Sequence, residues 1–463
     1  MPLSHASSAS AFELGLRRPV QYSLENGLSV VLQRDERRPR VAVAVAYRVG
    51  TRDDPEGYRG LAHLTEHMAF RGSRHLDDGE AMSAIEDVGG SANAATTTDN
   101  TIYFAELPAA HLPRALWIES ERMAFTLEAM SEEHADVECE VVGREWSLRR
   151  KNNVGARLAE FVQHEKSPPG HVYRHVDDLE TDVDGMELDH VRWFFQQHYR
   201  PSNATLVVVG DFNEGVARHL IERYFGPIGE PTTRTQRPDA PAVAFGGRAQ
   251  LTLASPVIDA RIEMHWSIPC RRLECISEML LASHVLASER TGMLGRALSE
   301  AGLPNRLAMN VVLHPEFMEV VLVNRLDSTK QAHTALLLLE EHLERARRER
   351  VDSDSLGMAK QAFATAFLER HDSALHLALQ LAEEPNVHLQ PLLERVMDVT
   401  PDSLRTAIAR KLPDERRLVV VLEHNKYATE EGELVGREGD LRPHAYRVAP
   451  AGPGERASQH GED

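Results

Sequence analysis

The chain has only three cysteines among its 463 residues: Cys139, Cys270 and Cys275. Three thiols do not make a disulfide framework, and Cys270 and Cys275, with no second cysteine pair nearby, are poor evidence for a structural metal site. The first residues also lack the basic start and apolar stretch of a secretory signal. These absences predict a reducing, cytoplasmic location.

Long apolar runs and an excess of positive charge are absent too. No run approaches the roughly 18 apolar residues of a membrane span, so we expect no membrane partner. The 52 lysines and arginines face 71 aspartates and glutamates, which gives a net charge of −19. Nucleic-acid binding requires a basic footprint, so we expect no nucleic-acid partner. The negative field would favour basic peptides, although the same charge also serves solubility alone.

The stretch from His63 to His67, with the sequence HLTEH, carries the most chemical information. Because residues four apart lie on one face of a helix, His63 and His67 can bind one metal ion together. Glu66 lies on nearly the same face, where its carboxylate could reach a water at the metal without being a ligand. This H-x-x-E-H order is the inverzincin signature. Two histidines and one carboxylate match a catalytic zinc site whose fourth position stays open.

The same five residues could also form a surface helix with two solvated histidines and a glutamate. The neighbouring side chains argue against this alternative. Leu61, Leu64, Met68 and Phe70 give the segment an apolar side, which indicates that the helix packs into a core.

A third metal ligand is predicted between residues 138 and 145, where the sequence reads ECEVVGRE. Glu138 and Glu145 are seven residues apart, two helical turns, so they face the same way. Glu145 follows His67 by 145 − 67 = 78 positions. HLTEH followed at this distance by E-x-x-V-V-x-x-E resembles the pitrilysin/insulinase family of zinc metallopeptidases. The resemblance implies that Glu145 ligates zinc and that Glu138 supports the site. The alternative for both is a charged, solvated helix face.

Other segments extend the resemblance. Residues 49–60 (VGTRDDPEGYRG) and 89–103 (GGSANAATTTDNTIY) match family patterns on either side of HLTEH, and residues 199–211 (YRPSNATLVVVGD) match a further family strand. In the family, the strand within 89–103 is an edge strand to which an extended peptide adds by β-augmentation. This implies that Asn93 and Ala94 bind substrate. The plain alternative is a polar turn and strand face.

The resemblance implies an α+β fold of two related domains, each a mainly antiparallel sheet covered by helices. One long helix is expected over about 275–303. A proline-rich stretch without an apolar period reads as a linker in the middle of the chain. The predicted organisation is a zinc-bearing N-terminal domain (1–230), the linker (231–241), a related domain without the metal motif (242–425) and a flexible tail (426–463).

The second half differs from the first in its chemistry. H-x-x-E-H does not recur there, so one zinc per chain is expected. Family members often carry an Arg and a Tyr in this half that hold the substrate backbone, and this chain has Leu298 and Asn305 at the matching positions. The departure implies the zinc-bearing subunit of a bacterial, processing-peptidase-like heterodimer, whose partner is a homologous non-catalytic subunit with the Arg/Tyr pair. A homodimer that manages without the pair is the alternative.

The sequence therefore predicts a zinc metalloendopeptidase that cleaves peptides in an enclosed chamber. Zn²⁺ held by His63, His67 and Glu145 is the predicted cofactor, and Glu66 is the predicted general base. The alternative is a non-catalytic core or assembly subunit of the same family, against which the intact motif counts. A zinc hydrolase for a non-peptide substrate is a third hypothesis. The sequence names neither the peptide substrate nor the cleavage site.

Overall fold

The structure is a computed structural model in which the chain forms two compact units. Unit 1 comprises residues 1–163, 172–238 and 357–398, and unit 2 comprises the remainder. Within the described part of the chain, no helix is both long and apolar enough to cross a bilayer. The described residues are 18–152, 159–160, 162–164, 166–176, 181–229, 237, 242–245, 249–255, 260–270, 276–288, 291–384, 389–424, 433–439 and 443–446.

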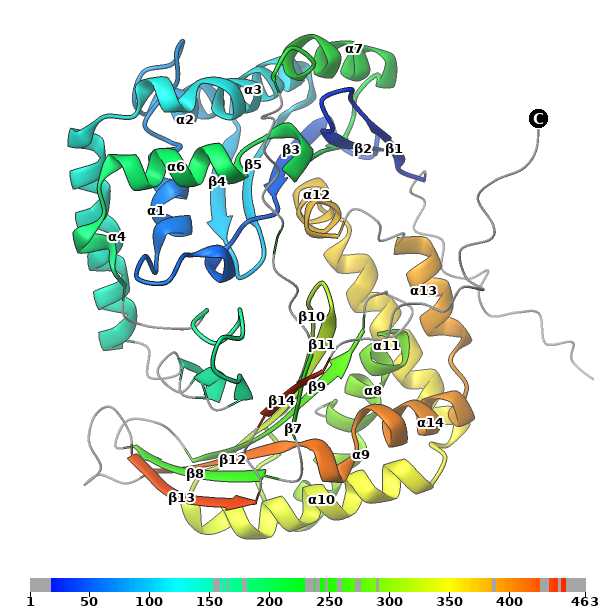
Figure 1. Cartoon of the computed structure of the whole chain (residues 1–463). Coiled ribbons are helices and arrows are strands. Elements are labelled where there is room, and N and C mark those ends of the chain that lie inside the picture. Colours follow the sequence, from blue (N-terminus) through cyan, green and yellow to red (C-terminus); the bar gives the residue numbers. More distant parts are fainter. Residues whose placement is uncertain are drawn as a thin grey trace, which may run out of the picture. The chain divides into compact units, whose positions relative to one another are not determined.

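Unit 1 is built on a six-stranded sheet with the order β1-β2-β6-β3-β5-β4 (Figure 1). The β2–β6 pair is parallel and the other pairs are antiparallel. The predicted mainly antiparallel sheet is therefore present. The strands are β1 (Val20–Ser23), β2 (Ser29–Arg34), β3 (Arg40–Tyr47), β4 (Ser91–Thr96), β5 (Thr101–Pro108) and β6 (Ala204–Gly210).

Helices cover both faces of this sheet because strand β3 is buried on both faces. Val41, Val43 and Val45 belong to the main core cluster, which also takes in residues of α1, α3, α6 and α7. The alternate residues of β3 are alanines, equally buried, and they point to the opposite face. Helix α12 packs against β3, β5 and β6, and the small alanine side chains leave room for it. The helices of unit 1 are α1 (Leu61–Met68), α2 (Glu80–Glu86), α3 (Leu112–Ala129), α4 (Glu132–Asn152), α6 (Leu188–His198), α7 (Glu214–Phe225), most of α11 (Ser353–Arg370), α12 (Ala374–Glu383) and α13 (Leu389–Asp398).

Unit 2 contains a second six-stranded sheet, with the order β10-β11-β9-β12-β8-β13, and a two-stranded sheet of β14 and β7. Its core is formed by alternate apolar residues such as Met264 and Trp266 of β9. Its strands are β7 (Ala242–Phe245), β8 (Ala249–Ser255), β9 (Arg261–Pro269), β10 (Leu307–Leu313), β11 (Phe317–Arg325), β12 (Leu418–His424), β13 (Glu433–Gly439) and β14 (Pro443–Tyr446). Its helices are α8 (Ser277–Ala287), α9 (Met293–Glu300), α10 (Ala332–Arg348), the start of α11 (Ser353–Arg370) and α14 (Pro401–Lys411).

The two six-stranded sheets repeat one topology. Read from the edge, β4-β5-β3-β6-β2-β1 corresponds to β10-β11-β9-β12-β8-β13. Each sheet has a parallel pair of neighbouring strands, and the two pairs occupy equivalent places: β6 with β2 in the first sheet and β12 with β8 in the second. The outermost strand differs, since β1 precedes β2 whereas β13 follows β12 in the chain. The predicted fold of two related α+β domains is thus confirmed.

The structure departs from the expected domain organisation and elements in three ways. Residues 357–398, expected in the C-terminal domain, belong to unit 1 because α12 fills the second face of its sheet. The segment 426–463, expected as a flexible tail, contributes β13 and β14. The long helix expected over 275–303 is two helices, α8 and α9, separated near Gly292. The linker 231–241 lies outside the described residues except for Arg237.

Cys270 is disulfide-bonded, and Cys139 is free. The sequence predicts no disulfide framework and a reducing setting, and the single bond at Cys270 is at odds with that setting. The cysteine count missed it because a single bridge needs only two suitably placed residues, and spacing alone does not give their geometry. Cys275 lies outside the described residues.

Candidate metal centre and active site

Helix α1 carries the HLTEH motif, and an aspartate outside the helix fixes its beginning. The helix starts after Gly60, whose φ of 96° is a left-handed conformation that favours glycine. The carboxylate of Asp54 accepts hydrogen bonds from the backbone N–H groups of Gly60 and Ala62, each 2.8 Å long. First-turn N–H groups have no partner within a helix, so Asp54 satisfies two of them. Burial raises the pKa of Asp54 to about 7, although these two hydrogen bonds lower it.

Arg122 of α3 fixes the other end of α1. Its guanidinium donates a 2.5 Å hydrogen bond to the carbonyl of Ala69 and pairs with Glu119 at 3.2 Å. It also lies over the rings of Phe70 and Tyr103. A cation at a helix C-terminus complements the helix dipole. With both ends held and its apolar side in the core, α1 presents its two histidines in a defined direction.

Helices α1 and α4 bring the three predicted ligands together. Nε2 of His63 lies 3.8 Å from Oε2 of Glu145, and Nε2 of His67 lies 3.9 Å from the same oxygen. One ligand atom from each residue lies within 4.8 Å of the others, and no second such group occurs in the described part of the chain. The Glu145 side chain is 51% exposed, so solvent reaches the group.

The donor set fits zinc. Two imidazole nitrogens and one carboxylate oxygen are the three-ligand set of many catalytic zinc sites. Zinc bonds of about 2.0 to 2.2 Å place the donors of a tetrahedral site about 3.3 to 3.6 Å apart. The separations from Glu145 to His63 and His67 are slightly larger. A small inward movement of the exposed Glu145 side chain closes the difference.

Glu138 lies behind His67 rather than among the three ligands. Its Oε2 is 2.8 Å from Nδ1 of His67, and its Oε1 accepts a 2.6 Å hydrogen bond from Nε of Arg71. Contact at Nδ1 directs Nε2 of His67 toward Glu145, which is how carboxylates orient metal-binding histidines. Burial raises the pKa of Glu138, but hydrogen bonds with His67 and Arg71 outweigh this effect and leave the pKa below its usual value. Burial lowers the pKa of His67, but the hydrogen bond with Glu138 and the nearby carboxylates raise it above its usual value.

Glu66 lies beside the metal group without belonging to it. Its residue is only 7% exposed, and Oε2 accepts a 2.5 Å hydrogen bond from the hydroxyl of Thr96. Burial raises the pKa of Glu66, and although the Thr96 hydrogen bond and the His67 charge lower it, the pKa stays above its usual value. A carboxyl group with a raised pKa is suited to accepting a proton and returning it near neutral pH.

Strand β4 forms an edge of the first sheet next to α1. Among the described residues its one strand neighbour is β5. Ala94 and Thr96 turn toward a half-buried face, while Asn93 and Ala95 are exposed. Oδ1 of Asn93 accepts a 2.8 Å hydrogen bond from the N–H of Ala94. The predicted substrate-binding residues therefore lie on an edge strand, and their contact with substrate stays a prediction.

Several residues at the site were not found from the sequence. Asp54 and Arg122 hold the ends of α1, Arg71 holds Glu138, and Thr96 binds Glu66. Nε1 of Trp146 lies 3.4 Å from Nδ1 of His63, at the long limit of a hydrogen bond. Two signals were available: an acid in the loop before an expected helix, and an arginine four residues after the second histidine, just beyond the end of α1. The other contacts depend on tertiary packing.

The two positions at which this chain lacks the family's Arg and Tyr are occupied by residues that pack within unit 2. Leu298 is fully buried in α9. Asn305 lies against α9, since a Cβ added at Gly295 would come within 2.6 Å of its side chain. Neither residue can therefore take the place of a long polar side chain that reaches for a substrate.

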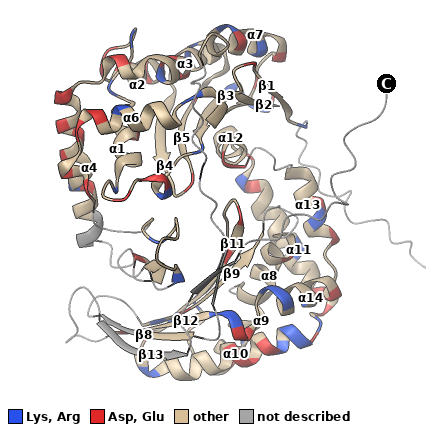
Figure 2. Cartoon of the chain, in the orientation of Figure 1, with Lys and Arg blue, Asp and Glu red and all other residues tan. Residues whose placement is uncertain are grey.

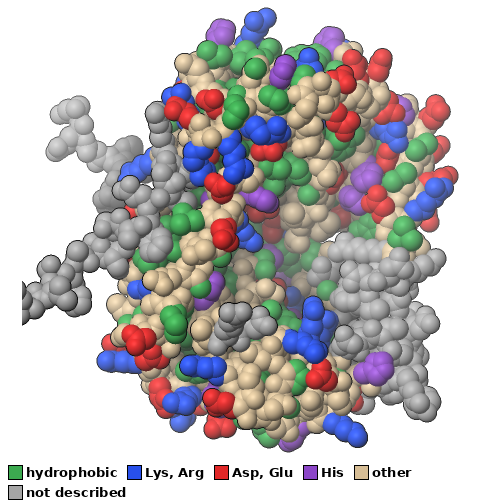
Figure 3. All heavy atoms as spheres, turned by 180° about the vertical axis from the view of Figure 1, so that it is seen from behind, with side chains coloured by type: hydrophobic (Ala, Val, Ile, Leu, Met, Phe, Trp, Pro, Cys, Tyr) green, Lys and Arg blue, Asp and Glu red, His purple; other side chains and the backbone are tan. Residues whose placement is uncertain are grey.

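Three carboxylates, those of Glu66, Glu138 and Glu145, lie at the metal group, and Arg71 pairs with Glu138. Acidic side chains recur along α4, the helix that carries Glu145 (Figure 2). On the face drawn in Figure 3, the described basic and acidic side chains are interspersed rather than gathered by sign. A local negative field favours cations, whether a metal ion or a basic peptide.

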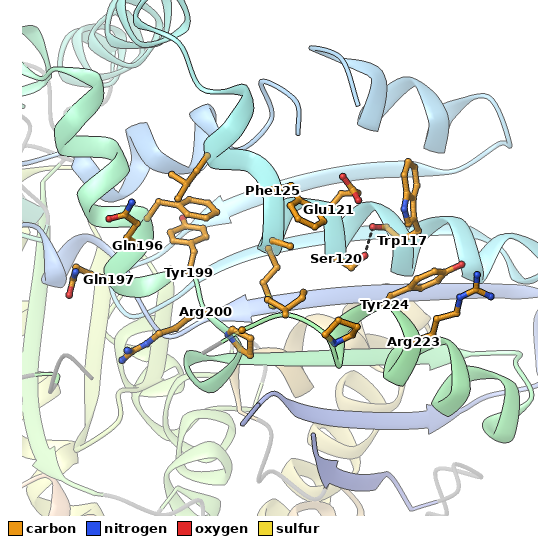
Figure 4. A pocket seen from close by; sticks show the side chains of 18 residues that line it. Trp117, Ser120, Glu121, Phe125, Gln196, Gln197, Tyr199, Arg200, Arg223 and Tyr224 are labelled. Atoms are coloured by element: carbon orange, nitrogen blue, oxygen red, sulfur yellow. Dashed lines mark hydrogen bonds between the residues drawn. The ribbon is translucent and has the colours of Figure 1, made fainter. Parts of the chain in front are cut away.

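A separate cavity of about 810 Å³ lies between α3, the end of α6 and the end of α7 (Figure 4). It is lined by aromatic residues such as Trp117, Phe125 and Tyr224, together with Arg223. None of the three predicted metal ligands lines it. The size of a cavity therefore does not mark the metal centre, which is the more exposed group between α1 and α4.

Two family models match the chain. The model described as insulinase, peptidase family M16, matches residues 29–167, which contain all three predicted ligands. The model described as the peptidase M16 inactive domain matches residues 185–363. The chain belongs to the insulinase family of peptidases. The identification agrees with the resemblance of HLTEH and its surroundings to that family.

Curated relatives of this insulinase-family chain include zinc proteases. The zinc protease PqqE of Helicobacter pylori is 30% identical over 206 residues, 44% of this chain and 46% of that protein. The coenzyme PQQ synthesis protein F of Pseudomonas aeruginosa is 27% identical over 85% of this chain and 48% of that protein. An uncharacterised zinc protease of Streptomyces coelicolor is 24% identical over 89% of this chain and 90% of that protein. The match to the first two thus spans about half of their length.

Solved structures share the fold. A protease from Helicobacter pylori superposes with a TM-score of 0.75 at 20% identity over 88% of this chain and all of that chain. The first half of the periplasmic protease PqqL from Escherichia coli gives 0.73 at 17% identity, covering 89% and 92%. A peptidase M16 inactive domain from Pseudomonas fluorescens gives 0.73 at 15% identity, covering 88% and 98%. Because the same fold occurs in a domain described as inactive, the fold alone does not decide activity.

Proposed function

We propose that this chain is a zinc-dependent endopeptidase in which His63, His67 and Glu145 hold the metal. The observation that carries the proposal is the convergence of these three ligand atoms within 4.8 Å, with the Glu66 carboxylate beside them. Relatives named zinc proteases support it. A chain that had lost catalysis would have no requirement to keep all four residues in this arrangement.

The residues around the metal group divide the chemistry between them. When bound, zinc acts as a Lewis acid that acidifies a water and polarises the scissile carbonyl. Glu66 accepts the proton of the attacking water and returns it to the leaving amine. Glu138 keeps Nε2 of His67 turned toward the metal position through its contact with Nδ1. Arg71 balances the charge of Glu138 and so limits electrostatic competition with the ligands.

The proposed substrate is a peptide in extended conformation. An edge strand presents unpaired backbone N–H and C=O groups that an extended segment can pair with. β4 is such a strand and lies against α1, so a peptide added to it would run close to the metal group. Asn93 and Ala94 would supply main-chain and amide contacts. An enclosed chamber, which would restrict substrates to short or flexible peptides, is part of the proposal.

We further propose that the active form is a heterodimer. Leu298 and Asn305 are committed to packing in unit 2 and offer no second anchor for the substrate backbone. A homologous non-catalytic subunit with an Arg/Tyr pair would supply it. A homodimer is the alternative assembly, and it would have to bind substrate through β4 alone.

A second candidate function is a non-catalytic core or assembly subunit of the same family. The match of residues 185–363 to a model described as an inactive domain favours it. That match begins at residue 185, however, after Glu66 and all three predicted ligands, which lie in the part matched by the insulinase model. The intact set of His63, Glu66, His67 and Glu145 counts against this candidate.

The cytoplasmic location stays a prediction. The disulfide bond at Cys270 weakens its basis, because disulfides are rare in the cytosol. A structural relative, PqqL of Escherichia coli, is described as periplasmic. Fractionation of the native cells, with antibodies against the chain, would decide between the two compartments.

The proposed function is tested by offering a peptide library to the protein in its native assembly and mapping the cuts by mass spectrometry. Zinc is measured in parallel by elemental analysis. We expect one zinc per chain and cuts that disappear after chelation and return with added zinc. Full zinc occupancy without any cleavage by the native assembly would favour the non-catalytic subunit instead.

A further inference from the structure

Strand β4 has two roles at the metal centre. Its backbone forms the edge to which a peptide is proposed to add, and its side chain at Thr96 contacts Glu66 inside the site. The hydroxyl of Thr96 donates a 2.5 Å hydrogen bond to Oε2 of Glu66. One residue thus lies between the proposed substrate strand and the proposed general base.

The neighbouring hydroxyl leaves the Thr96 proton to Glu66. Thr101 pairs with Thr96 across the β4–β5 register, and the two hydroxyl oxygens are 3.4 Å apart. The hydroxyl of Thr101 donates a 3.0 Å hydrogen bond to the carbonyl of Val49. Its proton is used there, so Thr101 could only accept in its 3.4 Å contact with Thr96. The Thr96 hydroxyl has one proton, and the shorter 2.5 Å bond to the Glu66 carboxylate takes it.

We infer that Thr96 is a positioning residue that holds the Glu66 carboxylate in its working orientation and links that orientation to the occupation of β4. This inference rests on the proposed peptidase function. Thr96 does not touch the reacting atoms. It acts through the buried Glu66, which the Thr96 backbone also contacts, so that Thr96→Val removes only the side-chain part of the contact.

The coupling follows from the stiffness of the residue. A β-branched side chain has few χ1 rotamers, so the Thr96 hydroxyl follows the backbone of β4. Among the described residues β4 is paired on one side only. A peptide added on the other side would hold the strand from both sides, and the hydroxyl and Glu66 would be held with it. Catalysis depends steeply on such alignment.

The inference predicts different effects on kcat and on KM. The bond from Thr96 leaves the backbone edge of β4 unchanged, so its removal should spare peptide binding. A hydrogen bond to a charged group contributes enough for its loss to cost about 10-fold or more. Removal of the hydroxyl should therefore lower kcat and leave KM near that of the parent.

The experiment compares three variants of the chain in its native assembly. Thr96→Val keeps the shape and removes the hydroxyl, and Thr96→Ser keeps the hydroxyl. Thr97→Val is the matched control, because the Thr97 hydroxyl does not contact Glu66. It bonds within the β4–β5 turn, where it donates to the carbonyl of Asn100 and accepts from the N–H groups of Asp99 and Asn100. Zinc content, kcat and KM are measured for each with one peptide that the parent cleaves.

We expect Thr96→Val to keep its zinc and its KM but lose about 10-fold in kcat. Thr96→Ser should recover most of kcat, and Thr97→Val should stay near the parent. A Thr96→Val enzyme with parental kcat, or an equal loss in Thr97→Val, would overturn the inference while leaving the proposed function standing. A zinc-loaded parent that cleaves nothing would overturn both.

Discussion

The role of each side chain at the metal centre depends on its surroundings and on what the rest of that side chain contacts. The two nitrogens of His67 illustrate this, since Nδ1 contacts Glu138 and Nε2 faces Glu145. Glu138 and Glu145 have the same chemistry and lie on the same helix. One is buried and held by Arg71, and the other is half exposed and free to move toward a metal. The difference in role is therefore a difference in surroundings.

We predict that Glu145→Gln loses the metal. It removes the charge of one of only three protein ligands, and no other carboxylate among the described residues completes the group. Zinc content after dialysis should fall from one per chain to well below that, and cleavage should fall with it. Glu140→Gln is the control, because Glu140 is exposed on the same helix and pairs with Arg144. If Glu145→Gln keeps one zinc per chain, another residue is the third ligand, with Glu138 the first candidate.

Glu138→Gln should have a milder effect. The amide can still contact Nδ1 of His67, but it no longer carries the charge that supports the ligand. Loss of such an outer partner typically costs about 10- to 100-fold in metal affinity or activity. Competition with a zinc chelator of known affinity gives the change. A loss as complete as that of Glu145→Gln would show that Glu138 is a ligand rather than a support.

At the scale of elements, helix α1 is short and is held by residues from outside it. Eight residues do not make a stable helix alone. Asp54 binds its first turn and Arg122 binds the carbonyl of Ala69 after its last turn. The arrangement places an acid at the positive end and a base at the negative end of the helix dipole. The position of the two histidines thus depends on the loop before α1 and on α3.

The ionisation of Asp54 should make the free energy of unfolding fall as pH rises. Its pKa is raised to about 7 in the folded protein, while an unfolded aspartate has a pKa of about 3.9. Between these values the folded state binds more protons, so the free energy of unfolding should fall as pH rises from about 4 to about 7.

Asp54→Asn keeps an acceptor oxygen but cannot ionise. Its free energy of unfolding should therefore change less over this pH range than that of the parent. The measurement is denaturant unfolding of the metal-free protein at several pH values. Asp87→Asn, at an exposed carboxyl on the C-cap of α2, should keep the slope of the parent. Equal slopes for the parent and Asp54→Asn would refute the assignment.

How much of this could be predicted from the sequence depends on the range of the interaction. The three metal ligands and Glu66 follow from spacing within helices and from the family resemblance. The alternation of valine and alanine in β3 indicates a strand buried on both faces, but it does not say that α12, more than 300 residues later, covers one of them. Arg122 and Thr96 likewise reach α1 only through packing. The break between α8 and α9 falls in five consecutive residues without an apolar side chain, 288–292 (SERTG), a signal that the prediction of one long helix passed over.

At the scale of the whole chain, one topology is used twice, and among the described residues only the first copy brings together a candidate metal-binding group. The second copy keeps the fold, and Leu298, which stands at the position of the family's Arg, is buried in its packing. A duplicated fold with chemistry in one copy is compatible with a second chain that supplies the missing substrate contacts.

We predict that the purified chain alone binds zinc but cleaves poorly, and that a partner chain restores cleavage. A peptide anchored only along β4 would not be held in the near-attack position on which the rate depends. The assay uses the lone chain at high concentration on a broad peptide set, with its mass in solution measured in parallel. A monomer or homodimer that matches the rate of the native assembly would contradict the heterodimer.

The most direct test of the central claim is a comparison of the parent with Glu66→Gln in the native assembly, measuring zinc per chain and peptide cleavage together. Glutamine keeps the shape of Glu66 but cannot accept a proton. We predict one zinc per chain in both proteins and a loss of cleavage of about 10²- to 10⁴-fold in the variant. A variant that cleaves within a few-fold of the parent, or a parent that holds no zinc, would contradict the account.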